Sequence, residues 1–144
     1  MRATLMLADS AQAVEGKLYI LGGGWSVTGP QPVPMAIALK VDVPWDQSNT
    51  RHRWRLELLD ADGQPVVLGG TEEEEGKPVE IEQEFEIGRP AGVKPGTALD
   101  FVVAINIQPL PLEPGRQYAW RLTIDGDSQD DWRLPFSTRS AAAT

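Results

Sequence analysis

Residues 17–29, KLYILGGGWSVTG, decide how this chain folds. Apolar residues typical of β-strands, Leu18–Leu21, run into three glycines, and Trp25 and a short β-branched piece follow. Glycine has no Cβ, so a strand uses it where the chain bends sharply or where another backbone comes close. The pattern therefore predicts one long strand with a bulge or corner at Gly22, Gly23 and Gly24 that redirects Trp25.

The size and charge of the chain limit its class. With 144 residues, the chain is expected to form a single domain over residues 1–138, followed by a flexible tail over 139–144. The net charge of −8 disfavours nucleic acid and an anionic membrane surface as partners, because both are negative themselves. The absence of cysteine excludes disulfides and thiolate chemistry.

The N-terminal residues predict a first strand and not a signal peptide. The apolar run after Arg2 is short, and Asp9 interrupts it. A signal peptide needs a longer uninterrupted apolar region. No stretch reaches the ~20 apolar residues of a membrane span. We therefore expect a cytoplasmic protein.

Alternation of apolar and polar residues, typical of strands, dominates the rest of the chain. It is clearest over residues 35–43, 52–58, 79–87, 99–107, 118–124 and 132–136. The segment 99–107 is the most apolar, which predicts a central strand, and residues 9–16 are expected to be a turn or a single helical turn. Helical spacing is absent, so the sequence predicts an all-β, two-sheet antiparallel sandwich of about eight or nine strands with minimal helix.

Two resemblances refine this prediction. The run Leu112-x-Pro114-Gly115-x-x-Tyr118 is similar to the strand entry of fibronectin type III and related immunoglobulin-like sandwiches. That resemblance implies an immunoglobulin-like β-sandwich in which the Tyr118 hydroxyl bonds back to upstream backbone. The usual disulfide between the sheets is missing, so an antibody-type domain is not expected.

The second resemblance covers the whole chain and is clearest in its N-terminal part. The runs Ala8-Asp9-x-Ala11-Gln12 and GKLYILGGGW, residues 16–25, resemble a family of small bacterial proteins of unknown function. The resemblance implies a compact bacterial domain without a signal peptide. It implies no activity, cofactor or catalytic residue.

Enzymatic chemistry finds little support in the sequence. The three glycines lack the spacing of a dinucleotide fingerprint and the Gly-Lys-Ser/Thr ending of a phosphate loop. The single histidine, His52, lies on the apolar face of its strand between arginines, without a candidate nucleophile, and is interpreted as structural. We therefore expect a protein that is not an enzyme and has no cofactor.

Acidic loops raise the alternative of a calcium site. Asp125, Asp127 and Asp130, with the neighbouring Asp131, supply the oxygen ligands that Ca²⁺ prefers, and Asp60 and Asp62 would join them if the two loops share an end of the sandwich. The spacing does not fit an EF-hand, since residue 136 is phenylalanine where the loop needs glutamate. An ordinary solvated hairpin is the competing interpretation, and it is favoured.

Charged stripes lie on the outer faces of two predicted strands. Their members are Arg51, Arg53 and Arg55 on one strand and Glu80, Glu82, Glu84 and Glu86 on the other. Opposite charges across neighbouring strands stabilise a sheet by about 0.2–1 kcal/mol per pair. The stripes are interpreted as a solvent-facing sheet, with a docking surface as the alternative.

Five tryptophans remain to be placed. Trp54, Trp120 and Trp132 fall on inward faces, whereas Trp25 and Trp45 lie beside loops or bends and either pack on the core or line a sugar or protein site. The sequence thus favours a non-catalytic cytoplasmic interaction or accessory module that binds another protein or a copy of itself. The alternatives are a small-ligand module, binding carbohydrate on Trp25 and Trp45 or calcium in the acidic loops, and then an enzyme of unrecognised type.

Overall fold

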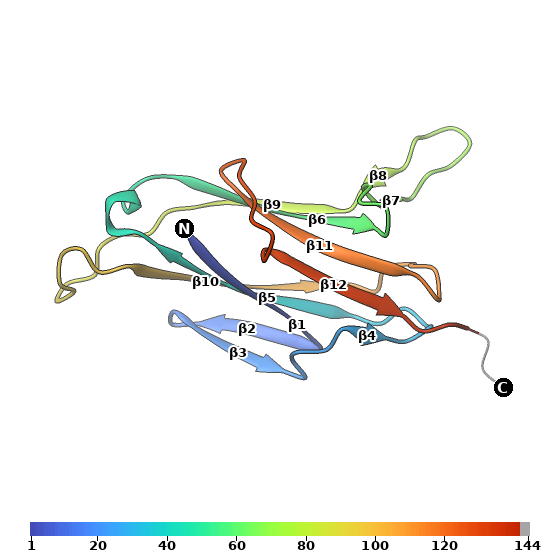
Figure 1. Cartoon of the computed structure of the whole chain (residues 1–144), viewed down its shortest axis with the longest axis horizontal. Coiled ribbons are helices and arrows are strands. Elements are labelled where there is room, and N and C mark those ends of the chain that lie inside the picture. Colours follow the sequence, from blue (N-terminus) through green and yellow to red (C-terminus); the bar gives the residue numbers. More distant parts are fainter. Residues whose placement is uncertain (142–144) are drawn as a thin grey trace.

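The computed structural model describes residues 1–141, which fold almost entirely into strands (Figure 1). They contain no α-helix and one 3₁₀ turn, η1, over Trp45–Gln47. The strands are β1 (Arg2–Ala8), β2 (Ser10–Val14), β3 (Lys17–Leu21), β4 (Val27–Thr28), β5 (Met35–Val43), β6 (His52–Asp60), β7 (Val67–Leu68), β8 (Lys77–Pro78), β9 (Glu80–Phe85), β10 (Leu99–Ile107), β11 (Gln117–Ile124) and β12 (Arg133–Thr138). None of the described elements is a helix long and apolar enough to cross a membrane.

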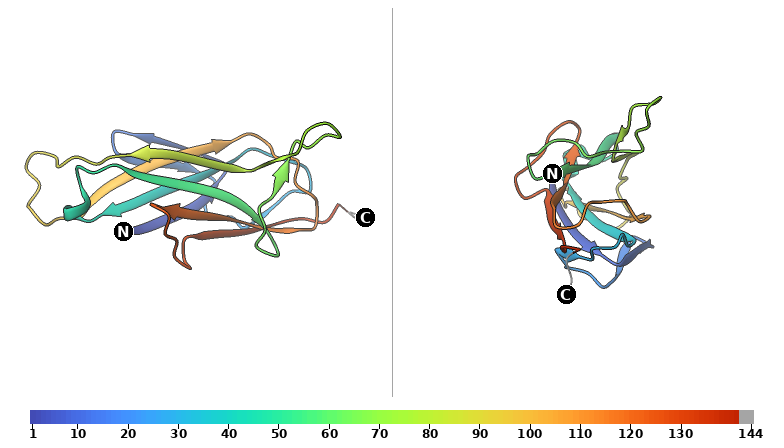
Figure 2. Two further views of the ribbon diagram at one scale, coloured as in Figure 1. Left: turned by 90° about the horizontal axis from the view of Figure 1, so that it is seen from above. Right: turned by 90° about the vertical axis from the view of Figure 1, so that its right-hand side faces the viewer.

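Two larger sheets form an elongated sandwich (Figure 2). One has the strand order β1-β5-β10 and the other β4-β12-β11-β6-β9, which gives three plus five, or eight, strands in the two layers. All pairs within them are antiparallel except β4 with β12, which is parallel. Two short hairpins, β2–β3 and β7–β8, are added to this frame. The all-β, sandwich-like class and the minimal helix content are confirmed.

The core lies between the two sheets and follows the alternation of the sequence. Trp54 and Trp120 are almost completely buried, and the predicted inward placement of Trp132 also holds at 4% exposure. Burial of each such large side chain stabilises the fold by about 1.5–3 kcal/mol. The side chains of β5 that face this core are Met35, Ile37, Leu39, Val41 and Val43.

Strand β5 is central in its sheet, and it is buried on both faces. Its outward residues Ala36 and Ala38 form a second apolar cluster with Ala8 of β1, and the β2–β3 hairpin covers them through Ala11 and Leu18. Alanine side chains are small enough to let the hairpin backbone approach the sheet closely. The hairpin therefore forms a third layer over part of the three-stranded sheet, against β5 and β10 (Figure 1).

Three local predictions were wrong. Residues 9–16 contain strand β2 and not only a turn, the predicted strand over 17–29 ends at Leu21, and the most apolar strand, β10, lies at the edge of its sheet. The outward face of β10 carries Ala104, which contacts the same alanine cluster. The third layer thus requires apolar residues on an edge strand, where a two-layer sandwich would expose polar ones.

The glycine bend carries the chain from the hairpin to the opposite sheet. Gly22 and Gly24 have φ angles of +62° and +91°, in the left-handed region that favours glycine. At Gly22 a Cβ would also lie 2.2 Å from the Asp9 carboxylate. The predicted bend is therefore present, but β3 and β4 on its two sides belong to different sheets.

Tyr118 is the second residue of β11, at the corner where this strand begins. Its ring is buried and packs on Phe136, and its hydroxyl oxygen accepts a hydrogen bond from the backbone N–H of Glu113 at 3.1 Å. Beyond β12, within the segment expected to be a tail, the N–H of Arg139 donates to the carbonyl of Thr28 at 2.8 Å. The remainder of that tail, residues 142–144, lies outside the described residues.

We expect Tyr118→Phe to destabilise the protein without changing its fold. Loss of the hydroxyl removes one hydrogen bond, which costs about 1 kcal/mol and up to ~3 kcal/mol if the N–H of Glu113 is left without a partner. Urea denaturation followed by tryptophan fluorescence measures this cost. A midpoint equal to that of the wild type would show that the corner hydrogen bond does not contribute to stability.

Candidate interaction surface

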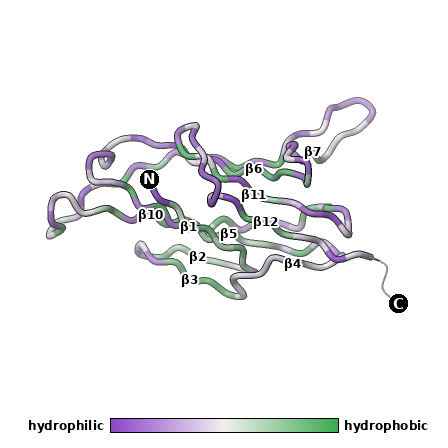
Figure 3. Tube along the Cα trace, viewed as in Figure 1, coloured by the Kyte–Doolittle hydropathy of each residue, from purple (hydrophilic) through white to green (hydrophobic). Residues whose placement is uncertain are grey.

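The β2–β3 hairpin exposes more large apolar side chains than any other part of the described chain. Tyr19 is 55% exposed and Leu21 is 70% exposed. The hairpin patch, as we call this surface, consists of Val14, Tyr19, Ile20 and Leu21 together with Met6 of β1. Figure 3 shows the hydrophobic colouring of β3 at the periphery of the molecule. Val14, Tyr19 and Leu21 share one face of the hairpin, and Ile20 and Met6 meet beside Gly23. Exposed apolar side chains gathered on one element in this way mark interaction sites in soluble proteins.

The strand register explains why these side chains face outward. Tyr19 and Leu21 lie opposite Gln12 and Ser10, and alternation places them on the face away from Leu18. Leu18 is the residue that packs on the alanine cluster. A groove of about 510 Å³ follows this surface, lined by Ser10, Ala11, Gln12, Tyr19, Ile20, Leu21 and Asn106.

Asn106 of β10 fixes the hairpin to the sheet beneath it. Its side-chain Nδ2 donates to the carbonyl oxygen of Ala11 at 2.9 Å, and its Oδ1 accepts from the N–H of Ala11 at 3.3 Å. One amide side chain thus satisfies both backbone groups of Ala11, on the edge of β2 that faces away from β3. These bonds attach the hairpin to the sheet through β2, while the outer edge of β3 is not paired with any strand of residues 1–141.

The chain around the hairpin patch is nearly free of charge. Residues 10–39 contain only Glu15 and Lys17 as charged residues, so their net charge is zero and the remaining residues carry the whole −8. Lys17 lies at the first position of β3, leaving Leu18–Leu21 without a charge that would prevent edge-to-edge pairing.

Trp25 packs on the core beside the glycine bend. Its ring meets Phe136 edge to face, with ring centroids 6.3 Å apart, and it contacts the main apolar cluster. The indole Nε1 is buried without a hydrogen-bond partner. The contacts describe an aromatic side chain that fastens the bend to the five-stranded sheet.

Trp45 lies at the opposite end of the sandwich. The guanidinium carbon of Arg89 is 4.2 Å from the centre of the Trp45 ring, and Arg89 also donates to the Trp45 carbonyl oxygen at 2.9 Å and to the Ser48 hydroxyl at 2.7 Å. One face of the indole is therefore covered. The structure does not bring Trp25 and Trp45 together, so they do not share a sugar-binding platform.

The carboxylate of Asp125 is already bonded within the protein. Its Oδ1 accepts from the N–H of Arg53 at 2.9 Å and its Oδ2 lies 2.6 Å from Nδ1 of His52. The Asp60 turn lies at the other end of the sandwich, because Asp60 is opposite Tyr118 whereas Ile124, next to Asp125, is opposite Trp54. Among residues 1–141, no three acidic or histidine side chains are grouped to hold a metal ion, Asp127 and Asp130 included.

His52 clamps two loops at this end. It is 8% exposed, and Nε2 lies 2.7 Å from the Gln47 carbonyl oxygen while Nδ1 meets Asp125. Both partners accept hydrogen bonds only, so the ring binds them best when both nitrogens are protonated. Burial lowers the pKa of His52, but the bonds to Gln47 and Asp125 outweigh it, and the pKa lies above the usual 6.5. The structural interpretation of this histidine is consistent with these contacts.

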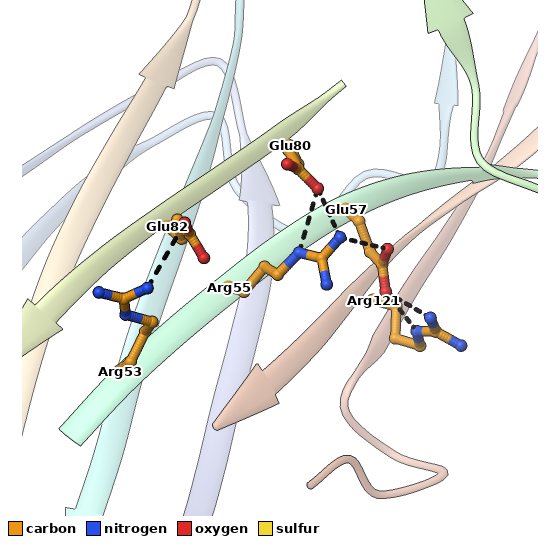
Figure 4. A network of polar contacts seen from close by, with 6 residues as sticks. All are labelled: Arg53, Arg55, Glu57, Glu80, Glu82 and Arg121. Carbon is orange, nitrogen blue, oxygen red and sulfur yellow. Dashed lines mark hydrogen bonds and ion pairs between the residues drawn. The ribbon is translucent and has the colours of Figure 1, made fainter. Parts of the chain in front are cut away.

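The charged stripes lie side by side on the outer face of the five-stranded sheet (Figure 4). Arg53 is opposite Glu84 and Arg55 is opposite Glu82, as expected for oppositely charged neighbours. Glu57, on the same outer face, is only 7% exposed because the guanidinium groups of Arg55 and Arg121 cover it. The Nε of Arg121 donates to Glu57 Oε1 at 3.0 Å.

The hairpin patch is a candidate surface that the sequence did not predict. The alternation of Tyr19 and Leu21 in an uncharged strand indicates an exposed apolar face. This inference requires knowing that residues 10–14 form the partner strand β2. The run SAQAV, residues 10–14, contains small and polar residues with little strand character. It forms a strand because Ala11 fits against the alanine cluster and Asn106 holds its backbone.

Fold and surface together define a small all-β sandwich that exposes an apolar hairpin with an open edge. The chain matches the family model described as a family of unknown function (DUF6941) over residues 3–137, and it belongs to this family. No curated protein matches the chain.

We expect Trp25→Ala to lower the free energy of unfolding by about 3 kcal/mol, because it empties the space against Phe136. Leu21→Ala is the matched control: Leu21 is 70% exposed, and its replacement should change stability by no more than about 0.5 kcal/mol. Chemical denaturation of both variants measures the two effects. Equal stability of Trp25→Ala and wild type would contradict the assignment of Trp25 to the core.

The raised pKa of His52 predicts a loss of stability with rising pH. In the unfolded chain the group titrates near 6.5, so the stabilisation is fully present below that pH and disappears as the pH rises through the higher folded-state value. Asp125→Asn should lower the His52 titration midpoint measured by NMR, whereas Asp127→Asn, which replaces another aspartate of the same loop, should not. A wild-type midpoint below 6.5 would contradict the clamp.

Proposed function

We propose that this protein is a non-catalytic, cytoplasmic interaction or accessory module that binds protein through the hairpin patch. The module is an immunoglobulin-like sandwich in this proposal, supported by the hydrogen bond from the Glu113 N–H to the Tyr118 hydroxyl. Such sandwiches present binding surfaces on a stable frame, and the frame alone specifies no reaction.

The exposure of the hairpin patch is the observation that carries the proposal. Tyr19 at 55% and Leu21 at 70% exposure would each be stabilised by transfer out of water. Both lie on a hairpin that Asn106 and the alanine cluster hold in place. A surface that is ordered before it binds loses little conformational entropy on association, which favours affinity.

The contacts give less support to the two alternatives. A carbohydrate platform needs exposed aromatic faces close together, whereas Trp25 packs on Phe136 and Trp45 carries Arg89 at the other end. A calcium loop needs free carboxylates, whereas both oxygens of Asp125 are bonded to Arg53 and His52. The hairpin patch requires no rearrangement before it binds a protein.

A quantitative pull-down with the tagged full chain tests the proposal. Leu21→Ser should lose the proteins that the wild type captures from a lysate of its native host, because it makes the patch polar. Val67→Ser is the matched control, since Val67 is 54% exposed on β7, outside the hairpin patch, and should capture the same proteins as the wild type. Captured proteins include any untagged copy of this chain. Identical capture by Leu21→Ser and wild type would overturn the proposal.

A further inference from the structure

We propose that the partner at the hairpin patch is a second copy of this chain, paired through the open edge of β3 about a two-fold axis at Tyr19. This inference rests on the proposed function and specifies its partner. It follows from the direction of the backbone hydrogen-bonding groups of β3, from the sequence of that strand and from its charge.

The hydrogen bonds of Ala11 reveal which groups of β3 point to the open edge. The N–H and C=O of Ala11 bind Asn106 and so point away from β3. Ile20 is opposite Ala11. In an antiparallel pair, the backbone N–H and C=O groups of two opposite residues either bond to each other or both point away from the partner strand. Ile20 therefore directs its N–H and C=O to the open edge, and the alternation gives Leu18 the same direction. The Leu21 carbonyl agrees, because it points to the β2 side and accepts from Asp9 at 3.0 Å.

A second β3 strand satisfies these groups symmetrically. If two copies pair antiparallel with Leu18 of one opposite Ile20 of the other, both residues exchange backbone hydrogen bonds at two equivalent places. Tyr19 then lies opposite Tyr19 of the second copy as a pair without backbone bonds, where side chains approach most closely. The two hairpins become one four-stranded sheet with Tyr19 and Leu21 on the same face. If the register shifted by one residue, Tyr19 would lie opposite Leu18 or Ile20, whose side chains are on the other face of the sheet.

The charge distribution makes the hairpin the surface at which a second copy is best tolerated. Residues 10–39 are neutral while the rest of the chain carries −8, so two copies repel each other least when they meet at the hairpin. The pairing is also complementary at its ends. The pairing places the positively charged Lys17 of one copy near the end of β3 in the second copy. There the negatively charged carboxylate of the second copy's Asp9 lies against its Gly22. An interface that uses the same surface twice is the usual form of a two-fold dimer.

Sedimentation velocity of the full chain over a range of concentrations tests the dimer. The wild type should show a reversible monomer–dimer equilibrium. Tyr19→Lys should raise the dissociation constant at least about tenfold, because it places two positive charges opposite each other at the axis. Val67→Lys, at a site of similar exposure on β7, should dimerise like the wild type.

Cysteine cross-linking tests the register. The chain has no cysteine, so Tyr19→Cys introduces one sulfur per copy. Across the axis the two Cα atoms would lie ~4.5 Å apart, within the range that a disulfide bridges. Mild oxidation should convert Tyr19→Cys to a covalent dimer far faster than Val67→Cys. Equal rates would overturn this register.

The outcomes separate the two proposals. A wild type that stays monomeric at its highest soluble concentration overturns the second-copy proposal, and so does a dimer that Tyr19→Lys does not weaken. If Leu21→Ser still abolishes capture of another protein in the pull-down, the proposed function stands without the dimer. If capture is also unaffected, both proposals fail.

Discussion

The packing of the β2–β3 hairpin on the alanine face of β5 is the contact on which the rest of the structure depends. Ala36 and Ala38 leave room for the hairpin backbone, and Ala11 and Leu18 fill that room. The hairpin has only one such face to bury. Its other face and the outer edge of β3 extend beyond the sandwich, so the contact that orders the hairpin also exposes Tyr19 and Leu21.

The remaining polar contacts hold the two ends and the outer face of the frame. His52 joins the loops around Gln47 and Asp125, and Glu57 is covered by guanidinium groups on the outer face. Each of these groups has its partners inside the chain, so each is explained by stability alone. The hairpin patch is different because Tyr19 and Leu21 keep more than half of their surface in water in the single chain. This contrast is the reason for placing the function there.

The sequence predicted the two layers well because alternation over residues 35–43, 52–58 and 118–124 reports one buried face per strand. It failed where a third layer intervenes. Alternation cannot reveal that the alanine face of β5 is also covered, and β10 was therefore interpreted as central. The glycine bend was located correctly, but its consequence, a change of sheet between β3 and β4, depends on long-range pairing. The candidate site was missed because β2 owes its strand conformation to contacts with Asn106 and the alanine cluster.

The central claim is that the outer edge of β3 pairs with a second copy. Amide hydrogen exchange of Leu18 and Ile20 tests it most directly, since these N–H groups should be free in the monomer and bonded in the dimer. The exchange of both should slow as protein concentration rises, while that of Tyr19, whose N–H faces β2 in either state, should change far less. Exchange of Leu18 and Ile20 that is independent of concentration in a dimerising sample would contradict the account.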